Sequence, residues 1–317
     1  MLFFMIFIII ILLYYFNIYF MQHFWYNFYK NLYKKKFYVN NLNKNIYSKS
    51  ILEKNEKNEL EILYKNYLKG VDVPFEYFLK TMPNPQIFFI KEDKIYGSIL
   101  NSITKISYKG NIYLTNFVDY AIIDIKKRKD GIFKDLMSYV SDYSNKMNAK
   151  YIMFKIDRAP IPSFMGYNFT SSYYSMEIGS SQSFPIGVKL FSSKELSDIS
   201  LSLTNFTLSP ILDENILSNG ENRITLKYNK TIINFKINSS ENIELLYLFY
   251  PNKQNIINII EYIKINYKFK RLMVDDIGNN WHIIKIYKEY FNYCYDVYHY
   301  ILGMSDKICK EKFYYYY

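Results

Sequence analysis

The sequence predicts an α+β protein with two halves of similar plan, preceded by a transmembrane helix. Three observations support this prediction. Residues 2–21 are almost unbroken apolar sequence, helical and strand-like patterns follow one another through residues 51–180, and a fainter series of the same kind occupies residues 181–317. No residue-level repeat accompanies the two series, so the expected duplication depends on the order of the elements alone.

The chain has 317 residues and a formal net charge of +11, which suits anionic partners such as CoA phosphates, nucleic acid or an acidic lipid surface. A lysine-rich surface without such a partner explains the charge equally well. Nucleic acid is not expected as a partner, because no RNP, helix-turn-helix or zinc pattern is present. The two cysteines and three histidines have no metal-ligand spacing, so we expect no metal site.

The apolar run from Leu2 to Met21 is long enough to cross a bilayer, which takes about 20 residues. No basic residue precedes the run and no small-residue cleavage site follows it, so a cleaved signal peptide is disfavoured. Lys30 and Lys34–Lys36 follow closely, and positive charge tends to stay cytoplasmic. We therefore expect a single-pass anchor over residues 1–21 with the body in the cytosol. A buried core helix is the alternative.

Residues 22–50 are predicted to be a linker, and polar sequence of weak periodicity continues to residue 58. The first half then alternates helical and strand-like spacing, with Gly70 ending the first helix and Lys109–Gly110 forming a turn. The predicted helices cover residues 60–68, 75–82 and 131–147, and the predicted strands cover 86–90, 95–107, 111–125, 151–156 and the end of 164–178.

Residues 181–210 are serine-rich and are interpreted as a connector to the second half. A hairpin is predicted over residues 224–238, with Asn229–Lys230 at its turn. We expect strands at 244–250 and 295–302, a helix at 256–267, and mixed structure at 281–287.

A basic turn between a buried strand and an amphipathic helix is the segment most informative about chemistry. The strand contains Asp119–Ile125, the turn is Lys126–Lys127–Arg128–Lys129–Asp130, and the helix begins after Gly131. The first N–H groups of such a helix lack internal partners and form an anion site with the helix dipole, which suits a pyrophosphate. A solvated basic loop is the alternative interpretation.

The spacing from Arg128 to Gly131 resembles the CoA loop of GNAT-type acyltransferases, in which an Arg/Gln-x-x-Gly-x-Gly/Ala sequence surrounds the pyrophosphate. Phe133 stands where that pattern has glycine or alanine. The resemblance implies that acyl-CoA is a co-substrate, that no prosthetic group is needed, and that the following residues bind CoA: Arg128, Lys129, Asp130, Gly131, Ile132 and Phe133.

From residue 23 to its end, the chain resembles the N-myristoyltransferases, whose fold is a tandem of two GNAT-like units. The resemblance follows the correct order along the chain. The matching segments are His23–Phe24–Trp25 for a Lys-Phe-Trp element that packs on CoA, Lys65–Asn66–Tyr67 for Asn-Tyr-Val, Pro74–Leu79 for Ser-Pro-Glu-Phe-Leu, Lys126–Arg128 for Lys-Lys-Leu-Arg, Phe164–Phe169 for Tyr-Trp-His-Arg-Ser-Leu, and Tyr298–Leu302 for the last strand.

This resemblance implies transfer of a myristoyl group from myristoyl-CoA to the N-terminal glycine of proteins. It places the oxyanion donors on the backbone of Tyr120 and Ala121, and the general base on the C-terminal carboxylate of Tyr317. The family's Thr-Ala-Gly segment is Lys155–Ile156–Asp157 here, and Asp157 is the candidate for a substrate contact. Residues 51–180 would bind acyl-CoA and residues 181–317 the peptide.

Three other interpretations stay open from the sequence. The chain is compatible with a degenerate homologue that binds acyl-CoA or peptide without catalysis, or with another GNAT-like acyltransferase for a different amine. A membrane structural or nucleic-acid-binding protein is the third, and the spread of the basic residues disfavours it. A frayed Tyr/Lys tail is the alternative for the residues that end at Tyr317.

Overall fold

The computed structural model describes residues 45–67, 75–80, 82, 84–128, 130–157, 168–180, 185–192, 199, 206–211, 217, 223–238 and 241–314. The apolar segment at residues 2–21 lies outside these ranges. Within them, no helix is both long and apolar enough to cross a membrane.

The strands in the described ranges form one 13-stranded mixed sheet, in the order β1-β2-β3-β4-β5-β13-β6-β12-β11-β10-β9-β7, with β8 paired to β3. Only two neighbouring pairs in it, β4–β5 and β11–β12, are parallel. The strands are β1 (Ile46–Lys49), β2 (Gln86–Lys91), β3 (Ile95–Tyr108), β4 (Asn111–Ile123), β5 (Tyr151–Asp157), β6 (Phe169–Glu177), β7 (Lys189–Leu190), β8 (Leu208–Pro210), β9 (Arg223–Tyr228), β10 (Thr231–Ile237), β11 (Asn242–Phe249), β12 (Arg271–Asp275) and β13 (Asn292–Leu302).

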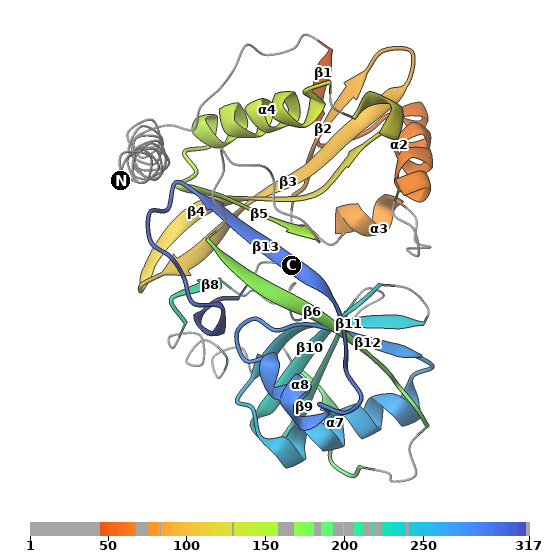
Figure 1. Ribbon diagram of the computed structural model, residues 1–317, viewed down its shortest axis with the longest axis vertical. Helices are drawn as coiled ribbons and strands as arrows, with labels where there is room; N and C mark the ends of the chain where they lie inside the picture. The colour runs from red at the N-terminus through yellow and green to blue at the C-terminus, as the bar shows by residue number, and fades with distance from the viewer. Residues whose placement is uncertain are drawn as a thin grey trace, which may run out of the picture.

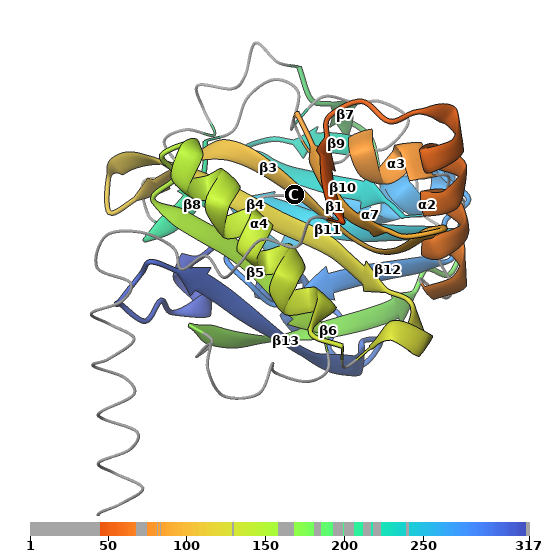
Figure 2. The ribbon, with the colours of Figure 1, turned by 90° about the horizontal axis from the view of Figure 1, so that it is seen from above.

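Helices cover the two ends of this sheet (Figures 1 and 2). In the first half, α4 packs on one face of β2 to β5, and α2 with α3 packs on the other face. In the second half, α7 and α8 pack on β9 to β12. The helices are α2 (Lys54–Tyr67), α3 (Phe75–Lys80), α4 (Ile132–Lys146), α7 (Lys253–Asn266) and α8 (Trp281–Ile286), with 3-10 turns η1 (Ile125–Lys127) and η3 (Lys310–Lys312).

Apolar periodicity explains why these segments are helices and strands. Leu136, Met137 and Val140 lie on the buried side of α4, and four isoleucines from Ile256 to Ile263 do so in α7. Side chains alternate between the two faces of the sheet along β2. Phe88 and Ile90 face α4, whereas Ile87 and Phe89 face α2. Asn252 caps α7 by accepting a hydrogen bond from the Asn255 N–H at 3.1 Å.

The two halves of the sheet meet at strands that are distant in sequence. β13 lies between β5 and β6, and β6 in turn pairs with β12, so the sheet is continuous from one half to the other (Figure 1). The face opposite α4 carries a central core, which we call the inner face. Its members include Phe117, Met153, Phe169, Ile232, Tyr247, Ile301 and Tyr314.

The structure differs from the sequence prediction in several elements. Residues 46–49, within the predicted linker, form an edge strand, and α2 begins at Lys54 within the polar sequence that follows it. The predicted strand at 111–125 ends at Ile123, residues 281–286 are helical, and strand β12 was not predicted. β12 has only five residues, and its pairing with β6 and β11 provides the hydrogen bonds that its short pattern could not indicate.

Gly278 approaches the core too closely for any side chain. Its φ is +55°, and a Cβ atom at this position would overlap the ring of Tyr314, which is fully buried. We therefore expect Gly278→Ala to lower the free energy of unfolding by about 3 kcal/mol, from backbone strain plus overpacking. Urea denaturation would measure this loss. Gly110→Ala is the matched control, because Gly110 has a φ of +78° but no atom near its Cβ position; equal losses in the two variants would contradict the overlap.

Candidate active site

A bulge in β4 lies where the sequence predicted the oxyanion donors. Leu100 of β3 pairs with Asp119, but Ser98 pairs with Ile122, so Tyr120 and Ala121 stand opposite one residue of β3. Tyr120 has a φ of +50°, a conformation that an aromatic residue rarely adopts. Two contacts hold it there: the Tyr64 hydroxyl donates to the Tyr120 carbonyl at 3.0 Å, and Lys236 Nζ donates to the Tyr120 hydroxyl at 2.7 Å.

The two predicted backbone donors are not equivalent. The Tyr120 N–H donates to Asp119 Oδ1 at 2.8 Å, so a carboxylate already occupies it. Ala121 has no partner in the register between β3 and β4, and it is exposed. An oxyanion could therefore use the Ala121 N–H directly, whereas the Tyr120 N–H becomes a donor only when Asp119 releases it.

β4 and β5 separate beside this bulge. Their parallel register covers only Thr115–Phe117 of β4 and Tyr151–Met153 of β5. Beyond it, β4 pairs with β3 and β5 pairs with β13, and no register joins β4 to β5. The ends of β4 and β5 therefore diverge beside the bulge.

The basic turn follows β4 directly. Asp124 caps η1, with its Oδ1 accepting hydrogen bonds from the Lys126 N–H at 3.0 Å and the Tyr67 hydroxyl at 2.9 Å. The Lys126 N–H and the Tyr67 hydroxyl hold the pKa of Asp124 below its usual value. Arg128 is exposed and lies 5.7 Å from the centre of the Tyr67 ring, and its Nε donates to the Ile123 carbonyl at 3.3 Å.

Gly131 is the N-cap of α4, with a φ of +79° and no side-chain hydrogen bond to the first turn. The first turn of this 15-residue helix therefore has no side-chain cap from Gly131, and such uncapped N–H groups suit an anion. Asp130 is exposed at this turn. The side chains of Ile132 and Phe133 pack in the α4 core, so these two residues can offer only backbone N–H groups.

Charged side chains gather on the inner face near Tyr120. Lys236 of β10 and Glu244 of β11 are paired in register, and they are 7% and 6% exposed. Lys155 of β5 lies two residues beyond the core residue Met153, on the same face, and is paired in register with His299 of β13. Burial raises the pKa of Glu244, but the charges of Lys155 and Lys236, together with side-chain hydrogen bonds from Asn238 and Tyr173, hold the pKa below its ordinary value.

Ser171, Asp275 and His299 are fully buried together on this face, and they come from β6, β12 and β13. His299 Nε2 lies 2.7 Å from Ser171 Oγ and 3.7 Å from Asp275 Oδ2. Because both oxygens face the same nitrogen, the imidazole does not stand between them as it does in a hydrolase triad. Burial, with Lys155 adding to it, holds the pKa of His299 well below its usual range, so the ring is neutral.

β11 and β12 also separate, after their register ends at Leu245 and Val274. Here the chain itself fills the opening. The Asn280 side chain donates to the Leu246 carbonyl at 3.2 Å, and the Tyr314 hydroxyl and the Asn279 side chain donate to the Leu248 carbonyl at 2.6 and 3.2 Å. In the first half, the described register between β4 and β5 ends beside the bulge at Tyr120 and Ala121.

Crystal structures of Saccharomyces cerevisiae N-myristoyltransferase with bound myristoyl-CoA are similar to this chain. One has a TM-score of 0.66 over 87% of this chain and 84% of the yeast chain, at 11% identity. Another, which also contains inhibitors, has a TM-score of 0.67 over 89% and 86%, at 10% identity. The fold is that of an N-myristoyltransferase.

At this identity the likeness to yeast N-myristoyltransferase concerns the fold alone. No protein-family model matches the sequence, and no curated protein sequence matches it. The fold is therefore recognised through the arrangement of the strands and not through sequence relatives.

The N-myristoyltransferase-like fold brings several predicted residues together. Tyr120, Ala121, Arg128 and Gly131 lie along the end of β4 and the start of α4, whereas Asp157 is exposed at the end of β5. The predicted residues His23, Phe24, Trp25, Lys129 and Tyr317 lie outside the described residues.

The sequence did not lead us to predict the titratable residues of the inner face as site residues. They are Lys155, Lys236, Glu244, Asp275 and His299. The available signal was a charge within an apolar strand, as at Lys236 in Thr231–Ile237 and Glu244 in Asn242–Phe249. A charged residue in such a run is expensive to bury unless it has a partner. It therefore marks a polar site more strongly than an exposed lysine does.

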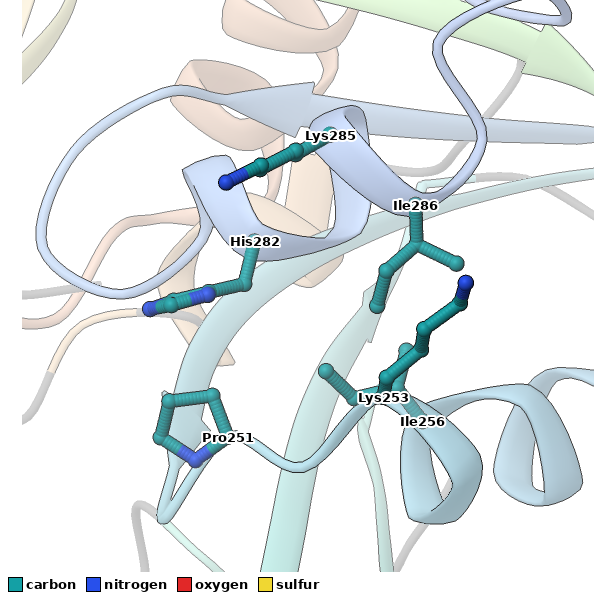
Figure 3. A pocket seen from close by; sticks show the side chains of 6 residues that line it. All are labelled: Pro251, Lys253, Ile256, His282, Lys285 and Ile286. Carbon is teal, nitrogen blue, oxygen red and sulfur yellow. The ribbon is translucent and has the colours of Figure 1, made fainter.

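A surface pocket of about 290 Å³ lies elsewhere, between the start of α7 and α8 (Figure 3). Burial, together with the charge of Lys285, lowers the pKa of His282 at this pocket. None of the predicted site residues lines it. Its lining residues are Pro251, Lys253, Ile256, His282, Lys285 and Ile286.

Proposed function

We propose that this chain transfers a myristoyl or similar long-chain acyl group from acyl-CoA to the N-terminal glycine of proteins, and that it is a divergent member of the N-myristoyltransferase family. The observation that carries the proposal is the bulge at Tyr120 and Ala121. It lies on β4 beyond the point where the register with β5 ends, directly before a basic turn and a helix N-terminus. This arrangement offers one place for a thioester carbonyl and another for CoA phosphates.

The donor would bind along the end of β4. The pyrophosphate would lie at the start of α4 near Arg128 and Gly131, and the pantetheine arm between β4 and β5. His23–Phe24–Trp25 and Lys129 would add CoA contacts. No prosthetic group takes part.

The reaction begins when the glycine ammonium loses a proton to the Tyr317 carboxylate. The amine nitrogen then forms a bond to the thioester carbon, and the Ala121 N–H stabilises the oxyanion that develops. When the carbon–sulfur bond breaks, the CoA thiolate leaves and takes the second proton of the amine. Asp157 is the candidate for a further peptide contact.

Residues 51–180 would form the acyl-CoA-binding GNAT-like half and residues 181–317 the peptide-binding half. Residues 1–21 would anchor the chain in a membrane with its body in the cytosol, and residues 22–50 would link the two. Mass-tagging of single cysteines placed before and after residues 2–21, in sealed vesicles, would establish whether the segment crosses and in which orientation.

The deciding experiment incubates the full chain in detergent with myristoyl-CoA or acetyl-CoA and a glycine-initiated peptide. We expect acyl transfer from the long-chain donor. A preference for acetyl-CoA would favour a GNAT-like acetyltransferase for another amine. A donor that binds tightly without any transfer would rule out catalysis with this acceptor.

A second candidate function is acyl-CoA binding without catalysis. The observation that favours it is the hydrogen bond from the Tyr120 N–H to Asp119 Oδ1, which occupies one of the two oxyanion donors. The same incubation separates the two candidates, because only the first yields an acylated peptide.

Reversing the charge at Arg128 is expected to weaken donor binding. Arg128→Glu replaces a cation near the phosphate position with an anion, so the Kd for myristoyl-CoA should rise about tenfold or more. Calorimetry with myristoyl-CoA measures this, and S-myristoyl-pantetheine, which lacks the phosphates, should bind as before. Lys146→Glu, at the far end of α4, is the matched charge control. Equal losses for both ligands would show that Arg128 acts on the fold and not on the phosphates.

A further inference from the structure

The buried carboxyl group of Asp275 is the unusual member of the inner-face cluster. It is 0% exposed and directly follows the last paired residues of the parallel strands β11 and β12. Its Oδ2 lies 3.7 Å from His299 Nε2, which is itself within hydrogen-bond distance of Ser171. The imidazole is neutral, so it offers Asp275 no compensating charge.

The other buried carboxylates of this region have hydrogen-bonding partners. Asp276 accepts hydrogen bonds from the Ser172 N–H at 2.8 Å and from Lys310 Nζ at 2.6 Å. Glu244 accepts a hydrogen bond from the Asn238 side chain at 3.0 Å, and the nearby lysines keep it ionised. Asp275 differs, because burial raises its pKa to about 7, and the opposing effects of Lys155 and Ser171 do not cancel this rise. Its charge can therefore change near neutral pH.

The groups that act on Asp275 come from every strand packed around it. Lys155 on β5 favours its ionised form, as does the Ser171 hydroxyl on β6, whereas the negative charges of Asp276 and Glu244 disfavour it. His299 on β13 is neutral over the range in which Asp275 titrates. Asp275 therefore changes charge between about pH 6 and 8 beside an imidazole that stays neutral.

The cluster is linked to the bulge at Tyr120 and Ala121, where the proposed reaction brings the acceptor amine to the thioester. Lys155 and Lys236 both act on Glu244, and Lys236 reaches the Tyr120 hydroxyl beside the bulge. An N-terminal amine approaches this site mostly as an ammonium ion, because its pKa is about 8. Two lysines repel such a cation, so the balance of charge on the inner face depends on its carboxylates.

We propose that the ionised carboxylate of Asp275 attracts the acceptor in its ammonium form, and that protonation of Asp275 weakens the binding of cationic acceptors. The effect acts through space among low-dielectric surroundings, so it requires no contact between Asp275 and the acceptor. This inference depends on the proposed acyl transfer for the location of the acceptor. It makes Asp275 a determinant of acceptor specificity and pH dependence.

Equilibrium binding tests the proposal independently of turnover. The full chain is loaded with a non-reactive thioether analogue of myristoyl-CoA, and the Kd of a glycine-initiated peptide is measured at pH 6 and 7.5. We expect the wild-type protein to bind the peptide several-fold to about tenfold more tightly at the higher pH. The same peptide with a glycolyl group, in which a hydroxyl replaces the ammonium, should bind equally at both values.

Asp275→Asn should remove the pH effect. At both pH values, its Kd for the glycine-initiated peptide should be close to that of the wild-type protein at pH 6. Asp93→Asn changes an exposed carboxyl of the first half, and this matched control should show the same pH effect as the wild-type protein. An unchanged Kd for the CoA analogue shows that the variant is folded, and Asp275→Ser serves if the asparagine variant does not accumulate. A pH effect that persists in Asp275→Asn, or that the glycolyl peptide shares, overturns the proposal. Wild-type protein that binds both ligands as expected but never transfers the acyl group refutes only the proposed function.

Discussion

Replacing Asp275 with asparagine is expected to make the protein more stable above pH 7 than the wild-type protein. The Asp275 carboxyl is fully buried, and its pKa of about 7 exceeds the 3.8 of an ordinary aspartate. The folded state therefore holds this proton more tightly than the unfolded state does. Between about pH 4 and pH 7 the wild-type protein must lose stability as the pH rises.

The sign follows from proton binding. In this window the folded chain binds more protons than the unfolded chain, so the free energy of unfolding falls with rising pH. The difference between a pKa of 3.8 and one of about 7 corresponds to about 4 kcal/mol, present below pH 4 and lost above pH 7. An asparagine cannot ionise, so the variant lacks this slope.

Urea denaturation at pH 5 and pH 8 would measure the effect. The quantity to compare is the change in unfolding free energy between the two pH values, because any packing cost of asparagine cancels in that difference. The wild-type protein should lose roughly 2 to 4 kcal/mol more than the variant over this range. Parallel pH profiles for the two proteins would show that Asp275 is ionised throughout and would contradict its raised pKa.

Local signals were sufficient for much of the fold. α4 and α7 were predicted because their apolar residues recur at helical spacing, and both elements are long enough for that spacing to be clear. The hairpin of β9 and β10 was predicted from its turn, where Asn229 has a φ of +52°. β1 and β12 were missed because strands of four and five residues show too little pattern, and only their neighbours in the sheet stabilise them.

In the candidate site too, the features formed by contiguous residues were predictable, and those that depend on distant residues were not. The basic turn and Gly131 are contiguous in sequence, so the position of the turn directly before the start of α4 was predictable. The bulge at Tyr120 was not, because it arises from a mismatch with β3 and is held by Tyr64 and Lys236, which lie 56 and 116 residues away. The cluster around Asp275 depends on pairings that include β13 between β5 and β6, and no local pattern specifies that order.

Extending the chain beyond Tyr317 is expected to abolish turnover while leaving donor binding intact. Tyr314, three residues earlier, is fully buried: its hydroxyl donates to the Leu248 carbonyl at 2.6 Å and its N–H donates to the Leu208 carbonyl at 3.0 Å. The remaining three residues can reach at most about 10 Å from this fixed point. On the inner face, Lys155 and Lys236 favour the negative charge of Glu244, and a terminal carboxylate that reached this face would meet the same two cations.

Adding a Gly-Ser-Gly tail would move the carboxylate away and place a neutral amide in its position. Loss of a general base typically costs about 10² to 10⁴ in rate, so kcat should fall by that factor with little change in the Kd for myristoyl-CoA. Tyr317→Phe is the matched control, because it changes the last side chain and keeps the terminal carboxylate. If the extended protein turns over at the wild-type rate, the terminal carboxylate is not the base, and the ionisable carboxyl groups of the inner face become the candidates. In that case Asp275→Asn should lower kcat as well as acceptor affinity. If Asp275 only attracts the ammonium ion, the substitution should lower acceptor affinity alone.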